Sequence, residues 1–492
     1  MSHIQLDYLQ KCRISSWIIY NLIIGSRFRP VLKRKIYDRL MEWKSRKDHN
    51  CLLVKGQRQV GKTYIIKKFA YDNYEKLVYI DFSLQRDVHQ AFDDNLDVDT
   101  VVRNLKLFLD PKDFIPDRTL IFFDEIQACP RARESLKLFS IDGRYDVIAS
   151  GSLLDVVDRK GTEALIPVGY EEPLTMYGLD FEEFLWAKGV PDESIDEVRD
   201  CIRSRRPFNS AYLKAMEDAF RDYCLVGGMP QAVVRYLETN DYTAAGEVLD
   251  RIIESSVDDI RKYNDDKDAL KIEHCFRSIP SQLSQSNKRY MFSRLDDDRP
   301  RTASRKYSDS LLWVLKAGLA SPCIQLDSPE IPLIAHCEQD VFRVYMSDTG
   351  ILLRMMGVNA RRAVYSEDTG FNMGAATENA ISECLMKGGY DRYFYKKNKG
   401  PDMMEIDFII ELGSELVAIE VKSGKTREAP SIGKIDRFHK VDRKMMFCKG
   451  NISMESGIEM YPLFAAAFMK DMEKEWDGPA LRDGTIAARP EV

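Results

Sequence analysis

The chain has 492 residues, of which 44% are hydrophobic and 30% are charged, and its formal net charge is −6. The length predicts about two to four domains, and the composition is that of an ordinary globular protein. The negative net charge excludes nucleic-acid binding by the chain as a whole, so any such binding requires a local basic patch.

The spacing of the cysteines and the length of the apolar runs bear on which further classes of protein the sequence excludes. The ten cysteines form no C-x-x-C pair, which argues against a zinc ribbon or a disulfide framework and fits a reducing cytoplasm. No apolar run reaches the roughly 18 residues of a spanning helix, so we expect no membrane segment.

The first part of the chain, residues 1–46, contains no motif that indicates catalysis or ligand binding. Residues 1–32 are expected to form a loose extension, because the apolar run at 17–24 is followed rather than preceded by most of its basic residues and is a poor signal peptide. Residues 33–46 have the spacing of an amphipathic helix. Its apolar face is formed by Ile36, Leu40 and Trp43.

The most specific motif lies at residues 51–63, which read CLLVKGQRQVGKT. A short apolar strand precedes the complete G-x-x-x-x-G-K-[ST] pattern of a phosphate-binding loop, and residues 63–70 follow with the spacing of a helix. Glycines let backbone N–H groups converge on phosphate oxygens, Lys62 would neutralise the β and γ phosphates of ATP, and Thr63 would hold Mg²⁺. The predicted nucleotide-binding residues are Gly56, Gln57, Arg58, Gln59, Val60, Gly61, Lys62, Thr63 and Tyr64.

Later strands are expected to bring polar side chains to the same site. After a strand at 77–82, residues 119–126 read TLIFFDEI, an apolar strand ending in two carboxylates, as in a Walker B motif. Asp124 would position Mg²⁺, and Glu125 would act with Lys62 in catalysis by polarising the attacking water. The alternative is two exposed acids at a strand end.

Residues 145–152 (YDVIASGS) predict one more strand, which ends in small hydroxylated side chains. Ser150 or Ser152 would then lie near the γ-phosphate and could sense it. A plain strand-ending turn explains the same residues equally well.

In order, GQRQVGKT, LIFFDEIQACP, IASGSLL, PVGYEEPLTMYGLDFEEFLWA and YCLVGGMPQAVVRYLE resemble one family of archaeal and bacterial AAA-type ATPases. The resemblance runs from residue 33 to about residue 470. It implies a phosphate-loop domain followed by a C-terminal domain long labelled as of unknown function. AAA-type proteins usually work as rings, so it also implies a homo-oligomer.

The chain departs from the family pattern at one place. The family often has a basic residue before its "PLSF"-like stretch, where this chain has Tyr170, and the proline of that stretch is replaced by Gly178. A sensing or trans-acting charge would be missing there. No spacing marks Arg131, Arg133 or Arg159 as its replacement.

The middle of the chain reads as mainly helical. Residues 190–225 have helical spacing, and residues 227–230 (GGMP) form a turn by composition. Arg235, on the next helix, either reaches back to a phosphate or is a solvated helix-face arginine, which is the commoner case.

A basic stretch follows within a segment that resembles the family's middle part. Residues 276–292 predict a short helix, a polar turn and a strand, and residues 307–319 predict a helix, which together fit a winged-helix-like unit. The basic stretch between them either contacts DNA phosphates or is a solvated loop. Its residues are Lys288, Arg289, Arg294, Arg299, Arg301, Arg305 and Lys306, opposed by Asp296, Asp297 and Asp298.

A second group of candidate catalytic or metal-binding residues lies near the C-terminus. Residues 405–411 and 415–422 are strand-like and are joined around a Gly-Ser pair at 413–414, which predicts a hairpin. If Leu412 pairs with Glu415, the strand period brings two acids and a lysine onto one face, with the cross-strand Cβ atoms about 5 Å apart.

These residues are Asp407, opposite Glu420, and Lys422. Two acids and a lysine suit a divalent-metal site that activates water against a phosphodiester, and the arrangement resembles the PD-(D/E)-x-K nuclease core. Glu378, on a helix at 375–387, matches the further acid often found there. Asp402 follows a proline but belongs to a loop start. The alternatives are a cross-strand charge network, or a nuclease-like fold kept for docking DNA without cutting it.

The sequence therefore predicts an α/β protein whose first domain is a P-loop NTPase parallel sheet with helices. The predicted divisions are an extension (1–32), an AAA-type core (33–190), a helical and winged-helix-like segment (191–335), a small α/β nuclease-like domain (336–475) and a loose tail (476–492). Three functions stay open: an ATPase coupled to DNA, an ATP-gated metal-dependent nuclease, and a nucleotide-binding scaffold without hydrolysis.

Overall fold

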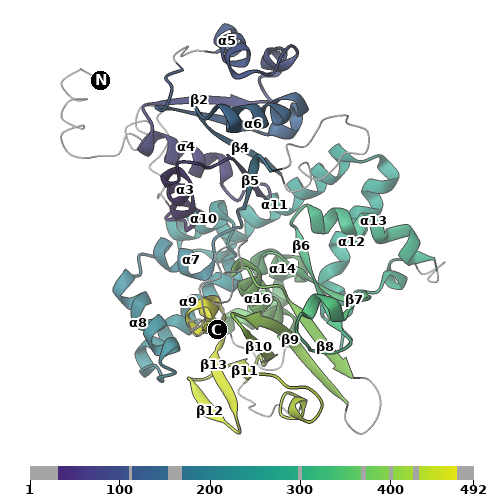
Figure 1. The fold of residues 1–492 in the computed structure, drawn as a ribbon. Coiled ribbons are helices and arrows are strands. Elements are labelled where there is room, and N and C mark those ends of the chain that lie inside the picture. Colours follow the sequence, from purple (N-terminus) through teal and green to yellow (C-terminus); the bar gives the residue numbers. More distant parts are fainter. Residues whose placement is uncertain are drawn as a thin grey trace, which may run out of the picture. The chain divides into compact units, whose positions relative to one another are not determined.

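The structure is a computed structural model that describes residues 32–109, 114–152, 169–296, 302–366, 373–397, 403–424 and 431–473. The chain divides into two compact units (Figure 1). Unit 1 consists of residues up to 189, 226–278 and 292–320, and unit 2 consists of residues 190–225, 279–291 and those from 321 onward. The predicted extension, apart from Leu32, and the predicted tail lie outside the described residues.

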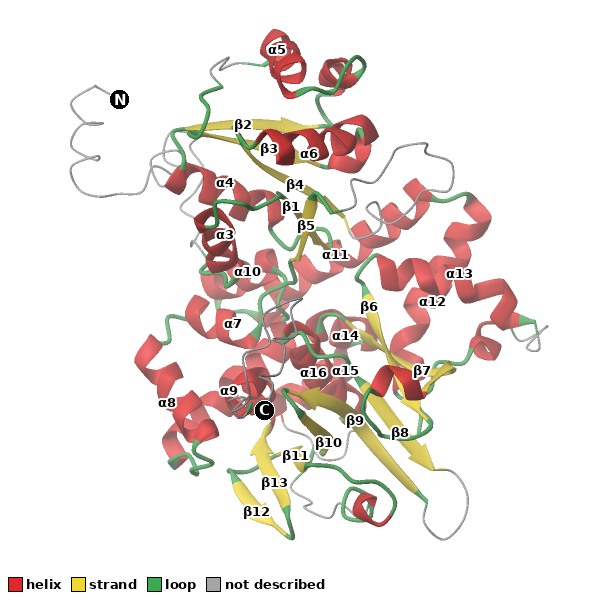
Figure 2. Ribbon diagram, in the orientation of Figure 1, coloured by secondary structure: helices red, strands yellow, loops and turns green. Residues whose placement is uncertain are grey.

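Unit 1 is built on a parallel sheet, as predicted (Figure 2). Its described strands have the order β2-β3-β4-β1-β5, and neighbours run parallel. Because β1 lies between β4 and β5, the loop that follows it leaves the carboxyl edge of the sheet beside the end of β4, with the end of β3 one strand further along. The strands are β1 (Cys51–Gly56), β2 (Lys76–Asp81), β3 (Thr119–Asp124), β4 (Asp146–Ser152) and β5 (Glu171–Thr175).

Helices flank this sheet and continue after it. The predicted first helix forms as α3 (Ile36–Ser45), with Ile36, Leu40 and Trp43 buried. The others in unit 1 are α4 (Lys62–Asn73), α5 (Val98–Phe108), α6 (Pro130–Asp142), α7 (Phe181–Ala187), α10 (Pro230–Thr239), α11 (Tyr242–Tyr263), α12 (Asp266–Leu283, whose end belongs to unit 2) and α13 (Ala303–Lys316). Short 3₁₀ helices are η1 (Arg86–Phe92), η2 (Ile126–Ala128) and η3 (Phe292–Leu295).

The segment predicted to be winged-helix-like differs from expectation. The helix predicted within 276–292 is the end of α12, and the helix predicted at 307–319 is α13, which begins earlier. The predicted strand near residue 290 does not form: Tyr290 N donates to Phe342 O over 2.9 Å, but no ladder continues from it. In its described part, the connection between α12 and α13 therefore has no β-hairpin wing.

Unit 2 contains a mixed sheet. Its described strands have the order β12-β13-β11-β10-β9-β8-β6-β7. They are β6 (Ala320–Leu326), β7 (Cys337–Met346), β8 (Tyr393–Lys397), β9 (Met404–Leu412), β10 (Glu415–Val421), β11 (Arg443–Cys448), β12 (Ser453–Glu455) and β13 (Ile458–Pro462). The helices are α8 (Asp192–Arg203), α9 (Ser210–Val226), α14 (Thr349–Met356), α15 (Val358–Ser366), α16 (Gly374–Lys387), η4 (Leu333–His336), η5 (Ile435–Arg437) and η6 (Leu463–Met472).

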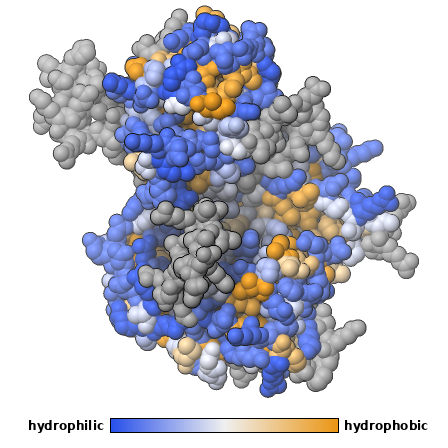
Figure 3. Space-filling view, in the orientation of Figure 1, coloured by the Kyte–Doolittle hydropathy of each residue, from blue (hydrophilic) through white to orange (hydrophobic). Residues whose placement is uncertain are grey.

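No described helix combines the length and the apolar character that crossing a bilayer requires. The face drawn in Figure 3 is mainly hydrophilic, with separate hydrophobic areas. Each cysteine that the structure describes is a free thiol.

Candidate functional site

The phosphate-binding loop connects β1 to α4, and both of its glycines are required by geometry. A Cβ on Gly56 would lie 2.3 Å from the Met176 carbonyl oxygen, a distance that no side chain tolerates. Gly61 has φ of 96°, in the left-handed region, and directly precedes α4. The loop therefore turns sharply and places the N-terminus of α4 where an anion would bind.

The loop lysine is folded into this turn. Lys62 Nζ donates hydrogen bonds to the carbonyl oxygens of Gly56 (2.9 Å) and Gln57 (3.0 Å). Burial lowers the pKa of Lys62, and the carboxylates of Glu125 and Asp124 act in the opposite direction. A buried cation held inside a ring of backbone atoms is available to phosphate oxygens that enter the same turn.

Asp124 is the centre of the polar contacts at the sheet edge. Its carboxylate, which is almost fully buried, accepts hydrogen bonds from Thr63 Oγ1 (2.8 Å), from the Tyr79 hydroxyl (3.1 Å) and from the Ser150 hydroxyl. A carboxylate and a hydroxyl this close are the hard oxygen ligands that Mg²⁺ prefers. The predicted Mg²⁺ residues thus lie together, and Ser150 joins them, while the side chain of Ser152 lies outside the described part.

Glu125 follows the strand at a special backbone position. It has φ of 52°, in the left-handed region, which turns the chain immediately after Asp124. Gln127 Nε2 donates a hydrogen bond to its carboxylate, and Glu125 lines the same cavity as Lys62 and Thr63. A carboxylate held beside the loop is placed to accept a proton from water.

The cavity over the loop has a volume of about 550 Å³. Its far wall comes from α10, where Arg235 was one candidate for reaching a phosphate, and from α11, which the sequence did not connect with the loop. Arg235 lines this wall, while also lying 3.9 Å from Glu238, so it is at the site and on a helix face at once. The lining residues beyond the predicted motif include Arg34, Met176, Pro230, Gln231, Val234, Arg235 and Arg251.

Arg34 lies outside the phosphate-binding loop but holds it in place, and the sequence analysis did not identify this residue. Its guanidinium donates to the carbonyl oxygens of Val60 (3.1 Å) and Tyr177 (2.6 Å), and its Nε lies 3.1 Å from Glu183 Oε2. Glu183 also completes a capping box at the start of α7 with Asp180. The Phe-Glu-Glu-Phe stretch, which is distinctive in the family resemblance, was the sequence signal that could have indicated Arg34. Two adjacent acids that become buried need a cation close to them.

Both departures from the family pattern have a structural account. A Cβ on Gly178 would lie 2.8 Å from the Gly228 carbonyl oxygen, so glycine at this position lets the Gly-Gly-Met-Pro turn approach. Tyr170 precedes β5, whose first residue Glu171 pairs with Cys51 at the amino end of β1. Tyr170 therefore lies at the sheet edge opposite the loop, and a basic residue there would not reach the nucleotide of its own subunit.

The other arginines considered are engaged elsewhere or lie outside the description. Arg133 lies 2.7 Å from Glu171, and Arg131 donates to backbone carbonyls of residues 92–94. Arg159 is not among the described residues. The predicted motif thus contains Lys62 and Arg58 as its basic side chains, and the wall adds Arg235 and Arg251.

The basic stretch at 288–306 is partly neutralised within the chain. Lys288 pairs with Glu378, Lys306 lies 2.7 Å from Asp296, and Arg289 donates to Gln325. Arg294 and Arg305 are exposed. Arg299, Arg301, Asp297 and Asp298 lie outside the described residues. Contact with DNA through this stretch stays a prediction.

In unit 2, the predicted hairpin has the predicted register. Leu412 pairs with Glu415, and the pairing continues to Phe408 with Ile419. One further step along this register sets Asp407 opposite Glu420. Asp407 Oδ2 accepts a hydrogen bond from Val421 N (3.0 Å), and Lys422 Nζ donates to Glu420 Oε1 (2.6 Å).

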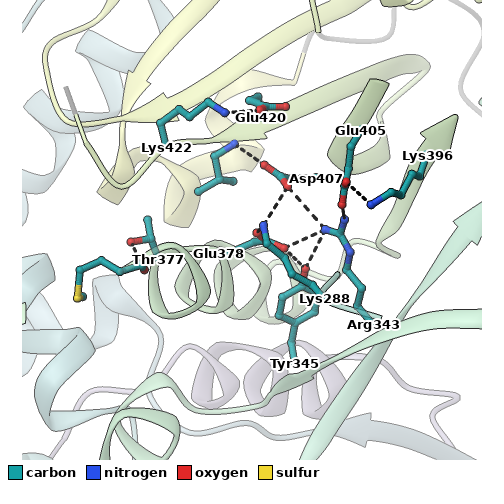
Figure 4. A network of polar contacts seen from close by, with 12 residues as sticks. Lys288, Arg343, Tyr345, Thr377, Glu378, Lys396, Glu405, Asp407, Glu420 and Lys422 are labelled. Carbon is teal, nitrogen blue, oxygen red and sulfur yellow. Dashed lines mark hydrogen bonds and ion pairs between the residues drawn. The ribbon is translucent and has the colours of Figure 1, made fainter. Parts of the chain in front are cut away.

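Two cations that the sequence did not connect with this hairpin enter the acidic cluster (Figure 4). Lys288 Nζ donates to Glu378 and lies 3.5 Å from Asp407 Oδ1. Arg343, fully buried on β7, lies 2.9 Å from Glu378 Oε1 and 3.6 Å from Asp407 Oδ1. No group of three or more metal-ligating side chains was found among the described residues. Asp402 lies outside the described residues.

Glu420 has an unusual protonation. Burial, followed by the charge of Asp407, raises the pKa of Glu420 to about 7, and its Oε2 atom is buried without a hydrogen-bond partner. A glutamate in the unfolded chain titrates near pH 4.5. Between these values the folded state holds a proton that the unfolded state has lost, so the stability of unit 2 falls as pH rises through this window.

Glu420→Gln should therefore stabilise the protein at pH 8, where the wild-type carboxylate is charged, with a rise in Tm of about 5 °C. The same variant should give no gain at pH 5, where the wild-type group is already neutral. Thermal unfolding of both proteins at the two pH values measures the difference. An equal effect at both values would show that Glu420 is ionised throughout.

The fold and the site together define a P-loop nucleotide-binding core. In agreement, residues 48–185 match the profile of a family described as "AAA domain". Residues 217–362 and 373–465 match two families described as "Domain of unknown function", DUF8612 and DUF4143. The predicted succession of an AAA-type domain and a C-terminal domain of unknown function is confirmed, and these matches give no support to a nuclease.

Among solved structures, the chain is similar to the Aeropyrum pernix ORC2 protein in its ADPNP–ADP complexes, with 13% identity and a TM-score of 0.37 over 70% of this chain and 98% of that chain. It is also similar to Cdc6p from Pyrobaculum aerophilum, with 11% identity and a TM-score of 0.25 over 71% and 98%. These TM-scores are too low to support any inference about activity or partners. No curated protein matches the sequence.

Proposed function

We propose that the protein is a Mg²⁺-dependent ATPase that binds and hydrolyses ATP in unit 1. The observation that carries this proposal is that Lys62, Thr63 and Glu125 line one cavity and that Asp124, next to Glu125, is hydrogen-bonded to Thr63, although the loop and the end of β3 are far apart in sequence. A site that only held nucleotide would need the loop, but it would not need a carboxylate held next to Asp124.

Each group has its own task. The loop N–H groups and Lys62 bind the β and γ phosphates, and Thr63 and Asp124 would hold Mg²⁺, which when bound neutralises charge on the phosphate oxygens. Glu125 orients a water molecule towards the γ-phosphorus and takes up its proton. Attack breaks the bond from phosphorus to the bridging oxygen, and ADP leaves with the electron pair. Ser150 keeps Asp124 oriented through its hydrogen bond.

The test is steady-state ATP hydrolysis with Mg²⁺, with and without double-stranded DNA, beside Lys62→Ala. Turnover that disappears in Lys62→Ala supports the ATPase, because the variant lacks the cation for the β and γ phosphates. Stimulation by DNA would support coupling to DNA, for which the basic stretch is the candidate contact. Tight ATP binding without turnover in either condition would favour the nucleotide-binding scaffold.

For the hairpin of unit 2 we favour a charge network over a metal-dependent nuclease. Lys288 and Arg343 provide the positive charge that a metal ion would otherwise bring to Glu378 and Asp407. Divalent-dependent DNA cleavage by the wild type that is lost in Glu420→Ala would reverse this preference. Cleavage that survives in Glu420→Ala would point to a contaminating nuclease.

A further inference from the structure

One loop residue makes contacts that phosphate binding alone does not explain. Arg58 lies between the two loop glycines, and its Nη1 donates to Asp259 Oδ1 over 2.6 Å. Its Nη2 donates to the Tyr263 hydroxyl over 2.6 Å. The two partners are 201 and 205 residues away in sequence, four residues apart and therefore on one face at the end of α11.

The geometry holds the Arg58 guanidinium in a fixed plane. The guanidinium carbon also lies 5.4 Å from the centre of the Tyr263 ring. Bonds to two separate acceptors fix the orientation of a planar fork, which a flexible ammonium group could not match. Ordering this long side chain before a ligand arrives removes much of the entropy cost of binding.

The contacts with α11 orient the Arg58 guanidinium without engaging all of its N–H donors. A guanidinium has five N–H donors, and the two bonds to α11 engage two of them. Arg58 lines the same cavity as Lys62 and Glu125, and its side chain is 36% exposed. Asp259 neutralises part of its charge, which lowers the cost of keeping a cation at this place before nucleotide binds.

We propose that Arg58 supplies, from within the same subunit, the positive charge that stabilises the transition state of ATP hydrolysis, with Asp259 and Tyr263 as its positioning residues. This inference rests on the proposed function. As water attacks and the bond to the bridging oxygen breaks, negative charge grows on the leaving ADP and on the transferred phosphoryl group. Arg58 donates to those oxygens, and the proton of the water passes to Glu125.

The consequence is that a neighbouring subunit need not provide an arginine. An arginine supplied in cis serves this purpose in other P-loop enzymes. The proposed role of Arg58 also links ATP hydrolysis to α11, because the residues that orient Arg58 lie on that helix. A purely structural tether would predict something different: loss of Arg58 would weaken folding or nucleotide binding and leave the chemical step alone.

The experiment compares Arg58→Ala, Arg58→Lys, Asp259→Asn and Tyr263→Phe with wild type in kcat, KM, the Kd for a fluorescent ADP and formation of the ADP–aluminium fluoride complex. Arg261→Ala is the matched control, because Arg261 is on the same helix and makes an exposed ion pair with Glu273 at 3.1 Å. The control should keep kcat within about twofold of wild type.

We expect Arg58→Ala to lower kcat by about 10³-fold, with the Kd for ADP changed by less than about threefold and the aluminium fluoride complex lost. Arg58→Lys should recover little, because lysine lacks the planar fork. Asp259→Asn and Tyr263→Phe should each lower kcat by about tenfold without changing KM.

Two results would overturn the inference. The first is a kcat for Arg58→Ala within about threefold of wild type. The second is that both Arg58 variants bind ADP with a higher Kd or fail to fold, while any folded variant protein that is recovered keeps the wild-type kcat. Failure of the proposed function looks different, because then wild type itself shows no turnover above Lys62→Ala and forms no aluminium fluoride complex.

Discussion

Replacing Glu125 by glutamine is expected to lower ATP turnover by about 10²- to 10⁴-fold, the usual effect of removing a general base. Glutamine has the same shape as glutamate, so it can keep the left-handed turn after Asp124 and a hydrogen bond with Gln127. It cannot accept a proton from water. The Asp124 contacts with Thr63 and Ser150 do not involve Glu125 and should persist.

Nucleotide binding should therefore survive in Glu125→Gln while the chemical step is lost. Steady-state turnover and equilibrium binding of ATP on the same preparation separate the two effects. Glu75→Gln is a suitable control, because Glu75 is an exposed acid of the same unit that pairs with Arg118 at 3.0 Å. Wild-type turnover in Glu125→Gln would remove Glu125 from the mechanism.

Arg343→Met is expected to destabilise unit 2 by about 3–5 kcal/mol, as is usual when one partner of a buried ion pair is removed. Arg343 is 1% exposed, and its guanidinium contacts Glu378, Glu405 and Asp407. Without it, several carboxylates remain buried with Lys288 as the nearest cation to Glu378. Lys288, which lies 3.5 Å from Asp407 Oδ1, would then have to offset a mutual repulsion and lost hydration that two cations offset in the wild type.

Urea unfolding of wild type and Arg343→Met gives the free-energy change, and hydrogen exchange in β9 and α16 locates it in unit 2. The matched control is Arg203→Met, whose exposed ion pair with Asp471 should contribute at most about 1 kcal/mol. Adding Glu378→Gln to Arg343→Met should restore part of the loss, since it removes one unpaired charge. An unchanged midpoint would mean that water enters the cluster.

Residues close in sequence were the part of the site that could be predicted. Gly56, Gly61, Lys62 and Thr63 form a local motif, and the positions of the strand ends brought Asp124 and Ser150 to them. The hairpin register was also predictable, because a two-residue turn and a strand period of two leave little freedom.

Contacts over long separations could not be predicted from one sequence. Nothing local to Arg58 indicates Asp259, and nothing local to Asp407 indicates Lys288 or Arg343. Arg58 was predicted to bind nucleotide, and Lys288 was placed in a stretch that either contacts DNA or is a solvated loop, but neither segment indicates the acids that these cations contact. The sequence left a metal site and a charge network open for Asp407, Glu420, Lys422 and Glu378, and the structure places the cations Lys288 and Arg343 next to Glu378 and Asp407.

By itself, the sequence determined the phosphate-binding loop, the strand that ends in Asp124 and Glu125, the parallel sheet and the C-terminal hairpin. These follow from backbone conformation and from apolar periodicity, which act over a few residues. Only the tertiary structure decided that α10 and α11 close the nucleotide cavity, that the two units interleave along the chain, and that buried cations neutralise the acids of unit 2. The physical reason is that burial and charge pairing depend on which segments meet in space, and each segment is compatible with many partners until the whole chain packs.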